Sequence, residues 1–205
     1  MTWHAQKFWT RCYSFTPPDE ERGTSSTKHT GEIFKDLDVF FSRHGISSMF
    51  DAGCNDAVWI KNLRLKLKYQ GGDISATAIE RAHVLTDLDV TLHDITLDPI
   101  PSCDVLWIRD VMIHLSNADR KRVLINWLSS SIPWLMMTQI DGVSNKDILY
   151  AEGNFPFSET NWYAEPWCFP LGTDKIYEMG SSSSRKMEMW HRDQIRNLDC
   201  LKQQG

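Results

Sequence analysis

The chain has 205 residues and a formal net charge of −5. This length suits one domain with its own hydrophobic core, and we expect residues 1–205 to form a single domain. An acidic chain lacks the basic surface on which non-specific nucleic-acid binding depends. Composition and charge therefore favour a small or neutral substrate over a nucleic acid.

The five cysteines are odd in number, widely spaced and without a Cys-x-x-Cys pair. This pattern argues against a disulfide framework and against a zinc site. The histidines also lack the spacing of metal ligands, so we expect no metal. No stretch approaches the roughly 20 apolar residues of a membrane span, and the first residues lack the apolar core of a signal peptide. We therefore expect a cytoplasmic, reducing location and no membrane span.

The first elements in chain order are a loop and a helix. Residues 16–30 are polar and contain two prolines, which predicts a loop. Apolar side chains at helical spacing, such as Leu37, Phe40 and Phe41, predict an amphipathic helix over 31–44. Strands and helices then alternate. We predict strands over 46–51, 69–73, 90–93, 103–109 and 134–139, and helices over 56–67, 76–85 and 117–130.

Residues 140–174 lack a clear periodicity and are expected to cross the ligand-binding edge as a substrate cover. Aromatic side chains are dense in this part of the chain: Tyr150, Phe155, Phe157, Trp162, Tyr163, Trp167 and Phe169. They either contact a substrate or form a small core beneath the loop. Residues 175–191 then predict a closing antiparallel hairpin.

Acidic residues stand at the ends of four consecutive predicted strands: Asp51, Asp73, Asp94 and Asp110. Parallel sheets covered by crossover helices bind ligands at the carboxyl ends of their strands. We therefore expect the ligand site at this edge. The alternative for each acid is the capping of a helix or turn.

A glycine turn follows the first predicted strand. Gly53 lets the backbone turn where a side chain would collide with a ligand, and Asn55 tolerates the left-handed conformation. The next helix would then offer free backbone N–H groups to the ligand. The second and third glycines of a dinucleotide motif are missing, which disfavours a pyrophosphate.

Two further acids fit an adenosine. Asp73 lies 22 residues after Asp51, where a carboxylate accepts hydrogen bonds from both ribose hydroxyls. Asp94 is placed to accept from the adenine amino group, with Ile95 packing on the ring. These positions predict an adenosine pocket without a strong phosphate clamp.

Four segments together resemble the class I S-adenosylmethionine-dependent methyltransferases: Asp51-Ala52-Gly53-Cys54-Asn55, Gly72-Asp73-Ile74, His93-Asp94-Ile95 and Trp107-Ile108-Arg109-Asp110. The resemblance runs from about residue 31 to residue 191. It implies a Rossmann-like three-layer α/β sandwich, with helices on both faces of a seven-stranded, mostly parallel sheet whose last strand is antiparallel.

The same resemblance implies S-adenosylmethionine as the cofactor and S-adenosylhomocysteine as its product. The cofactor-binding core would span residues 31–139, with these contacts: Asp51, Gly53, Cys54, Asn55, Asp73, Ile74, Asp94, Ile95 and Arg109. Residues 1–30 would cover the cofactor through Trp9 and Tyr13, for which ordinary packing is the alternative.

Methyl transfer requires positioning of the acceptor and removal of its proton. Asp110 and His114 are four residues apart, so one helical turn would put them on one face, where the acid could orient the imidazole. Either residue is a candidate general base, and Arg109 is a candidate for orienting the substrate. A purely structural histidine is the alternative for His114.

The segments Arg109-Asp110 and His114-Leu115-Ser116, with the aromatic loop, are similar to small bacterial and viral glycan methyltransferases. This similarity favours a sugar or glycan hydroxyl as the acceptor, such as that of the deoxysugar rhamnose. His114, Trp162, Tyr163 and Trp167 would contact it. The chain would then be a complete enzyme or one module of a larger glycan-building enzyme.

Two alternatives remain open at this point. The acceptor could instead be an amine, a phosphoramidate or a nucleic-acid base. The chain could also bind an adenosine ligand without catalysing a reaction.

Overall fold

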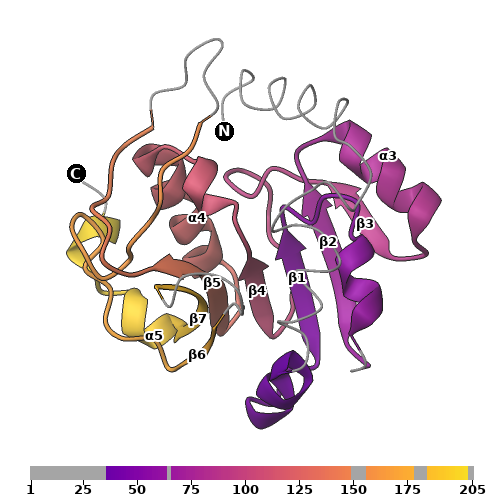
Figure 1. Ribbon diagram of the computed structural model, residues 1–205, viewed down its shortest axis with the longest axis horizontal. Helices are drawn as coiled ribbons and strands as arrows, with labels where there is room; N and C mark the ends of the chain where they lie inside the picture. Colours follow the sequence, from indigo (N-terminus) through magenta and orange to yellow (C-terminus); the bar gives the residue numbers. More distant parts are fainter. Residues whose placement is uncertain (1–35, 64–65, 149–155, 178–183, 203–205) are drawn as a thin grey trace.

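The computed structural model describes residues 36–63, 66–148, 156–177 and 184–202. Within these residues, seven strands form one sheet in the order β3-β2-β1-β4-β5-β7-β6 (Figure 1). Their bounds are β1 Ser48–Ala52, β2 Lys68–Asp73, β3 Asp89–Leu92, β4 Val105–Ile108, β5 Trp134–Ile140, β6 Asp174–Tyr177 and β7 Arg185–His191.

Strands β1 to β5 pair in parallel, whereas β7 is antiparallel to both of its neighbours, β5 and β6. The predicted fold class is therefore confirmed, including the antiparallel last strand. The predicted hairpin is also present, with Asp174 opposite Met189 and Tyr177 opposite Lys186.

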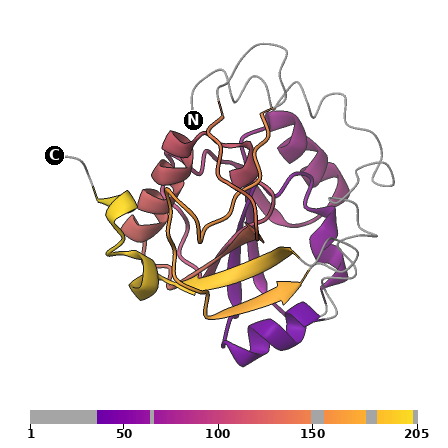
Figure 2. The ribbon, with the colours of Figure 1, turned by 60° about the vertical axis from the view of Figure 1, so that its left-hand side comes forward.

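Helices cover both faces of the sheet (Figure 2). One face packs against the helical segment 36–43, the 3₁₀ helix η3 (Val58–Asn62) and helix α3 (Ala76–Leu85). The other face packs against helices α4 (Asn117–Ser129) and α5 (Arg192–Ile195). Strand β4 shows the pattern this requires, because Val105 and Trp107 join one core and Leu106 and Ile108 join the other.

Helices α3 and α4 begin where serine side chains cap them. The Ser75 hydroxyl accepts from the N–H of Ala78, and the Ser116 hydroxyl accepts from the N–H of Asp119. These two helices match the predicted ranges 76–85 and 117–130 closely.

The predicted helix over 56–67 is wrong. In its place is the short η3, from Val58 to Asn62. Asn55 and Ala57 both have positive φ, 55° and 53°, so the chain cannot enter a regular right-handed helix there. The Trp59 ring then turns into the core and stacks on Trp107, with ring centroids 5.7 Å apart.

The described residues between β5 and β6 form no helix or strand. This part of the chain corresponds to residues 140–174, which the sequence predicts to cover the substrate, and it is called the cover segment below. Ile140 donates its backbone N–H to Thr160, and Trp162 lies in the core beneath. The described helices include none that is long and apolar enough to cross a bilayer.

Candidate functional site

The glycine turn stands at the carboxyl end of β1, where the sequence predicts it. Gly53 has a φ of 84°, and its N–H donates to the carbonyl oxygen of Gly72 at 2.7 Å. Asn55 adopts the predicted left-handed conformation. The structure adds a reason for the glycine within the protein itself, because a Cβ at residue 53 would lie 2.2 Å from Cγ2 of Val111. The protein itself, through the segment after β4, therefore excludes a side chain from this position.

We expect Gly53→Ala to lower the free energy of unfolding by about 2–5 kcal/mol, because left-handed strain costs roughly 1–2 kcal/mol and overpacking roughly 1–3 kcal/mol. Gly45→Ala is the matched control, since Gly45 also has positive φ but open space around the added Cβ. Denaturant titration measures both variants. Adding Val111→Ala to Gly53→Ala should restore part of the lost stability, and no restoration would contradict this explanation.

Asp73 ties the glycine turn to the end of β2. Its Oδ2 accepts from the N–H of Asn55 at 3.0 Å, and its Oδ1 accepts from the N–H of Ser75 at 2.8 Å. Burial raises the pKa of this carboxyl to about 6, although hydrogen bonds from the backbone N–H groups of Ser75, Asn55 and Ile74 oppose that shift. The two carboxylate oxygens have about four lone-pair positions between them, so the group can still accept from a ribose hydroxyl.

The backbone N–H groups of the turn are already paired. Cys54 donates to Gly72, Ala57 donates to Cys54, and Val58 donates to a carboxylate oxygen of Asp56. The free N–H groups expected from a following helix are therefore not found at these positions. This arrangement fits a ligand that brings no phosphate to the turn.

Asp51 and Cys54 lie beneath the turn. Asp51 is 2% exposed, and its Oδ2 accepts from the Tyr69 hydroxyl and the Trp59 indole, each at 2.9 Å. Burial raises the pKa of this carboxyl to about 7. The Cys54 side chain is buried in the same core. Both side chains therefore support the turn from within the protein.

The predicted adenine contacts lie in the segment after β3. Oδ1 of Asp94 accepts from the N–H and the hydroxyl of Thr96. This acid therefore caps a turn, which is the alternative that the sequence analysis gave for each of the four acids. Ile95 is buried beside α4, and Ile74 is half-buried after β2. Trp9 and Tyr13 lie outside the described residues.

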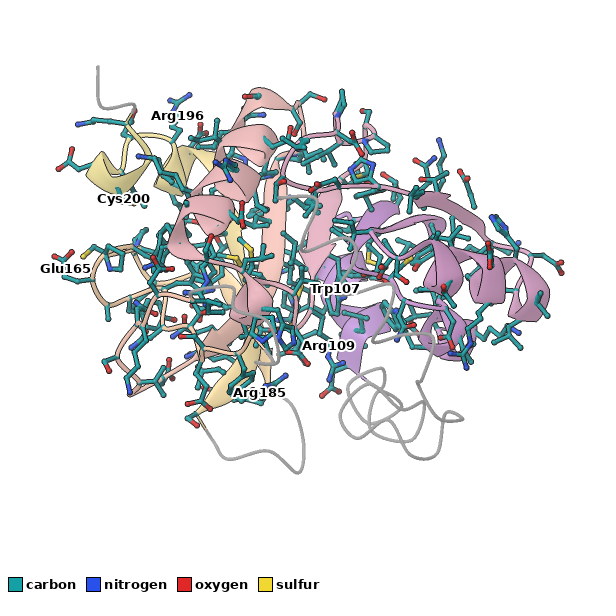
Figure 3. The ribbon with its side chains drawn as sticks, turned by 90° about the horizontal axis from the view of Figure 1, so that it is seen from above. Trp107, Arg109, Glu165, Arg185, Arg196 and Cys200 are labelled. Carbon is teal, nitrogen blue, oxygen red and sulfur yellow. The ribbon has the colours of Figure 1, made fainter. Side chains whose placement is uncertain are left out.

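Arg109 and Arg185 lie near one another beside the end of β4 (Figure 3). The guanidinium groups of both arginines lie close to the carboxylate of Asp110. Arg185, at the start of β7, contacts Oδ1, and Nη1 of Arg109 lies 3.8 Å from Oδ2. Asp110 has a φ of 60°, and Thr138 holds it by exchanging hydrogen bonds with its N–H and its carboxylate, both at 2.9 Å. Oδ1 is thus engaged by a guanidinium and a hydroxyl, whereas Oδ2 is buried and has no hydrogen-bond partner among the described residues. Sequence reasoning missed Arg185 and Thr138, since neither lies near Asp110 in the chain.

His114 ends the 3₁₀ helix η4 (Met112–His114), and its Nδ1 lies 2.7 Å from the carbonyl oxygen of Pro156. A carbonyl only accepts, so Nδ1 carries the proton and Nε2 carries the lone pair of the neutral ring. Burial lowers the pKa of His114 from its usual value, while the bond to Pro156 opposes the shift. The sequence predicted Asp110 as the group that orients this ring, but the structure gives this hydrogen bond to Pro156.

Arg120 fixes the surroundings of His114. The side chain is fully buried and donates to the carbonyl oxygens of Met112 and Ser158, at 2.8 and 3.0 Å, and to the side chain of Asn117. It thereby joins η4 to the cover segment. The sequence pattern indicates the burial of Arg120, because this residue lies on the same helical face as the apolar residues Val123, Leu124 and Trp127.

The aromatic side chains that the structure describes between β5 and β6 divide into two groups, while Tyr150 and Phe155 lie outside the described residues. Trp162, Trp167 and Phe169 are at most 4% exposed and belong to the core, which favours the alternative of a core beneath the loop. Tyr163 is half-buried, and its hydroxyl contacts Glu188. Phe157 is 54% exposed and lies beside His114. Nothing in the sequence distinguishes Phe157 from its neighbours.

Within the described part of the chain, no group of three or more His, Cys, Asp or Glu side chains is arranged to hold a metal ion.

No family model and no curated protein matches the chain. Solved structures do match it. The mitomycin 7-O-methyltransferase has a TM-score of 0.60 at 16% identity, over 91% of this chain and 57% of that one. The chain thus spans little more than half the length of that protein.

Two shorter proteins match along most of both chains. The Burkholderia thailandensis 1,6-didemethyltoxoflavin-N1-methyltransferase has a TM-score of 0.63 at 9% identity, covering 92% of this chain and 87% of that one. The magnesium protoporphyrin IX methyltransferase of Synechocystis PCC 6803, solved with bound S-adenosylmethionine, has a TM-score of 0.57 at 13% identity, covering 92% and 91%. The chain therefore has the class I fold of S-adenosylmethionine-dependent methyltransferases.

Proposed function

We propose that this protein transfers the methyl group of S-adenosylmethionine to a hydroxyl oxygen of a small acceptor. The fold and the turn between Gly53 and Asn55 support the cofactor. Asp73 supports the ribose contact through the remaining lone pairs of its carboxylate. Bound at this edge, the cofactor would supply an electrophilic methyl carbon on a sulfonium.

The general base in this proposal is His114. The observation that carries it is the hydrogen bond of Nδ1 to Pro156, which directs the lone pair to Nε2. Because the pKa of the ring is lowered, it is neutral and able to accept a proton at neutral pH. Oδ1 of Asp110 is engaged by Arg185 and Thr138, and the guanidinium of Arg109 lies 3.8 Å from Oδ2, which makes no hydrogen bond among the described residues. Because two positive charges stabilise the carboxylate and weaken it as a base, we assign Asp110, with Arg109, to positioning the acceptor.

The position of His114 also suits an acceptor beside the cofactor. Val111, three residues earlier, fills the space next to Gly53. The base therefore stands on the segment that touches the cofactor turn, and proton removal would occur close to the transferred methyl.

We expect His114→Asn to lower kcat about 10²- to 10⁴-fold, the usual contribution of a general base, while the Kd for the cofactor stays within about twofold. In the wild type, kcat/KM should rise with pH to a plateau, with a midpoint below the usual pKa of histidine. His83→Asn, on the exposed side of α3, is the control. A fully active His114→Asn variant would remove this residue from catalysis.

A sugar or glycan hydroxyl remains within this proposal, including a role as one module of a glycan-building enzyme. Its support from the aromatic loop is reduced to Tyr163 and Phe157, because Trp162 and Trp167 pack in the core. Incubation with S-adenosylmethionine and a panel of sugars and other hydroxyl compounds, analysed by mass for one added methyl group, tests the activity directly.

A further inference from the structure

Phe157 is an exposed apolar ring held against the proposed base. Its ring centroid lies 6.0 Å from that of His114, with the planes tilted by 56°. Aromatic pairs adopt this separation when they are in contact. Trp162, Trp167 and Phe169 of the same segment are buried in the core. Phe157 is exposed, so its environment differs from that of these neighbouring aromatic residues.

The backbone on both sides of Phe157 is fixed by hydrogen bonds. Pro156 accepts from His114, and Ser158 donates its N–H to Ile113 at 2.8 Å. The Ser158 carbonyl accepts from Arg120, and the Ser158 hydroxyl donates to the carbonyl oxygen of Lys146 at 2.8 Å. These bonds determine where the ring stands. An exposed phenylalanine on such a rigid support gains stability when another apolar surface covers it.

The ring is connected to the proposed cofactor turn through the segment after β4. Phe157 lies beside His114, His114 ends the 3₁₀ helix that follows Val111, and Val111 fills the space beside Gly53. The proposed base and the exposed ring therefore stand on the segment that borders the proposed cofactor turn.

We propose that His114 and Phe157 form the acceptor subsite, and that this subsite takes a flat aromatic ring carrying the reacting hydroxyl. The proposal rests on the proposed function. A phenylalanine face offers no hydrogen bond, and on either side of it the carbonyl oxygens of Pro156 and Ser158 and the N–H of Ser158 already have partners. A phenol brings one hydroxyl to His114 and an apolar face to Phe157, whereas a sugar ring brings several hydroxyls that need partners.

The chemistry of the base agrees with this choice. A phenolic hydroxyl, with an ordinary pKa of about 10, releases its proton far more readily than an alkyl hydroxyl. A weak base such as an imidazole of lowered pKa acts best on the more acidic group. In the transfer, the phenolic oxygen bonds to the methyl carbon, the carbon–sulfur bond breaks with its electron pair left on sulfur, and the proton passes to Nε2 of His114.

The probe that tests the proposal is 4-hydroxybenzyl alcohol, which carries a phenolic and an alkyl hydroxyl in one molecule. We expect methylation at the phenolic oxygen, and a slower reaction or none with methyl rhamnoside. Methylation of the alkyl hydroxyl, or of the rhamnoside in preference to the phenol, would overturn the inference.

The variants are Phe157→Ala and Phe157→Trp. We expect Phe157→Ala to raise the KM for the phenol about tenfold, because an aromatic contact of roughly 1.4 kcal/mol is lost. Phe157→Trp should stay within about threefold of the wild type. Leu171→Ala is the control, since Leu171 is also an exposed apolar residue of the cover segment.

Binding measured without turnover separates the two proposals. Saturation-transfer NMR of 4-hydroxybenzyl alcohol, with S-adenosylhomocysteine present, should show ring contact in the wild type and in Leu171→Ala but a much weaker signal in Phe157→Ala. If that pattern appears while no acceptor is methylated, the proposed function fails and the ring subsite stands. Equal binding by Phe157→Ala overturns the subsite, whatever the activity.

Discussion

Asp73→Ala is expected to abolish measurable binding of S-adenosylmethionine, with Kd raised at least about 100-fold. A hydrogen bond from a ribose hydroxyl to a charged carboxylate contributes roughly 1.5–3 kcal/mol. The substitution also frees the N–H of Asn55, which loosens the turn on which the methionine part of the cofactor would rest. Isothermal titration calorimetry measures the change.

The pH dependence of binding gives a second test of the same residue. Because burial raises the pKa of Asp73 to about 6, the carboxyl gains a proton as the pH falls through 6 and then has fewer lone pairs to offer. Cofactor affinity in the wild type should therefore be constant above pH 7 and weaken below pH 6. The control is Asp87→Ala, in the exposed turn after α3. Normal binding by a folded Asp73→Ala variant would place the cofactor elsewhere.

Arg120→Met is expected to lower the free energy of unfolding by about 3–5 kcal/mol. The buried guanidinium supplies donors to Met112, Asn117 and Ser158, and each buried acceptor left without a donor costs roughly 1–3 kcal/mol. Methionine keeps most of the volume of the side chain, so the loss would reflect the missing hydrogen bonds. The midpoint of a urea titration reports it.

A neighbouring arginine supplies the control for this prediction. Arg122 lies on the same helix with an exposed side chain that pairs with the buried carboxylate of Asp119, and this carboxylate keeps the Ser116 hydroxyl as a second partner when Arg122 is replaced. Arg122→Met should therefore change stability little. Arg120→Lys keeps the charge but cannot reach three acceptors at once, so we expect an intermediate loss and a reduced kcat. Equal stability of the two methionine variants would contradict the role assigned to Arg120.

Periodicity and capping residues were sufficient to predict most of the sheet and two of its helices. The five parallel strands follow from apolar runs between helical patterns, and Ser75 and Ser116 begin α3 and α4 through contacts within one turn. The positive φ of Gly53 and Asn55 is a local property of those residue types. Local interactions decide such features, and a sequence displays them directly.

Contacts between distant residues decided the rest. Positive φ at Asn55 and Ala57 prevents the helix predicted after Gly53, and η3 then forms where Trp59 bonds to Asp51 and stacks on Trp107 of β4. His114 meets Pro156, 42 residues away, and Asp110 meets Arg185, 75 residues away.

The aromatic residues of the cover segment show the same division. A sequence pattern gives the spacing of apolar side chains along one element, but it does not say which partner each side chain meets. Trp162 enters the core, while Phe157 is held at the surface by hydrogen bonds of the residues beside it. The sequence by itself therefore determined the class of fold and the edge at which to look for the site. The tertiary structure decided which side chains stand there, because burial and hydrogen bonding depend on partners far along the chain.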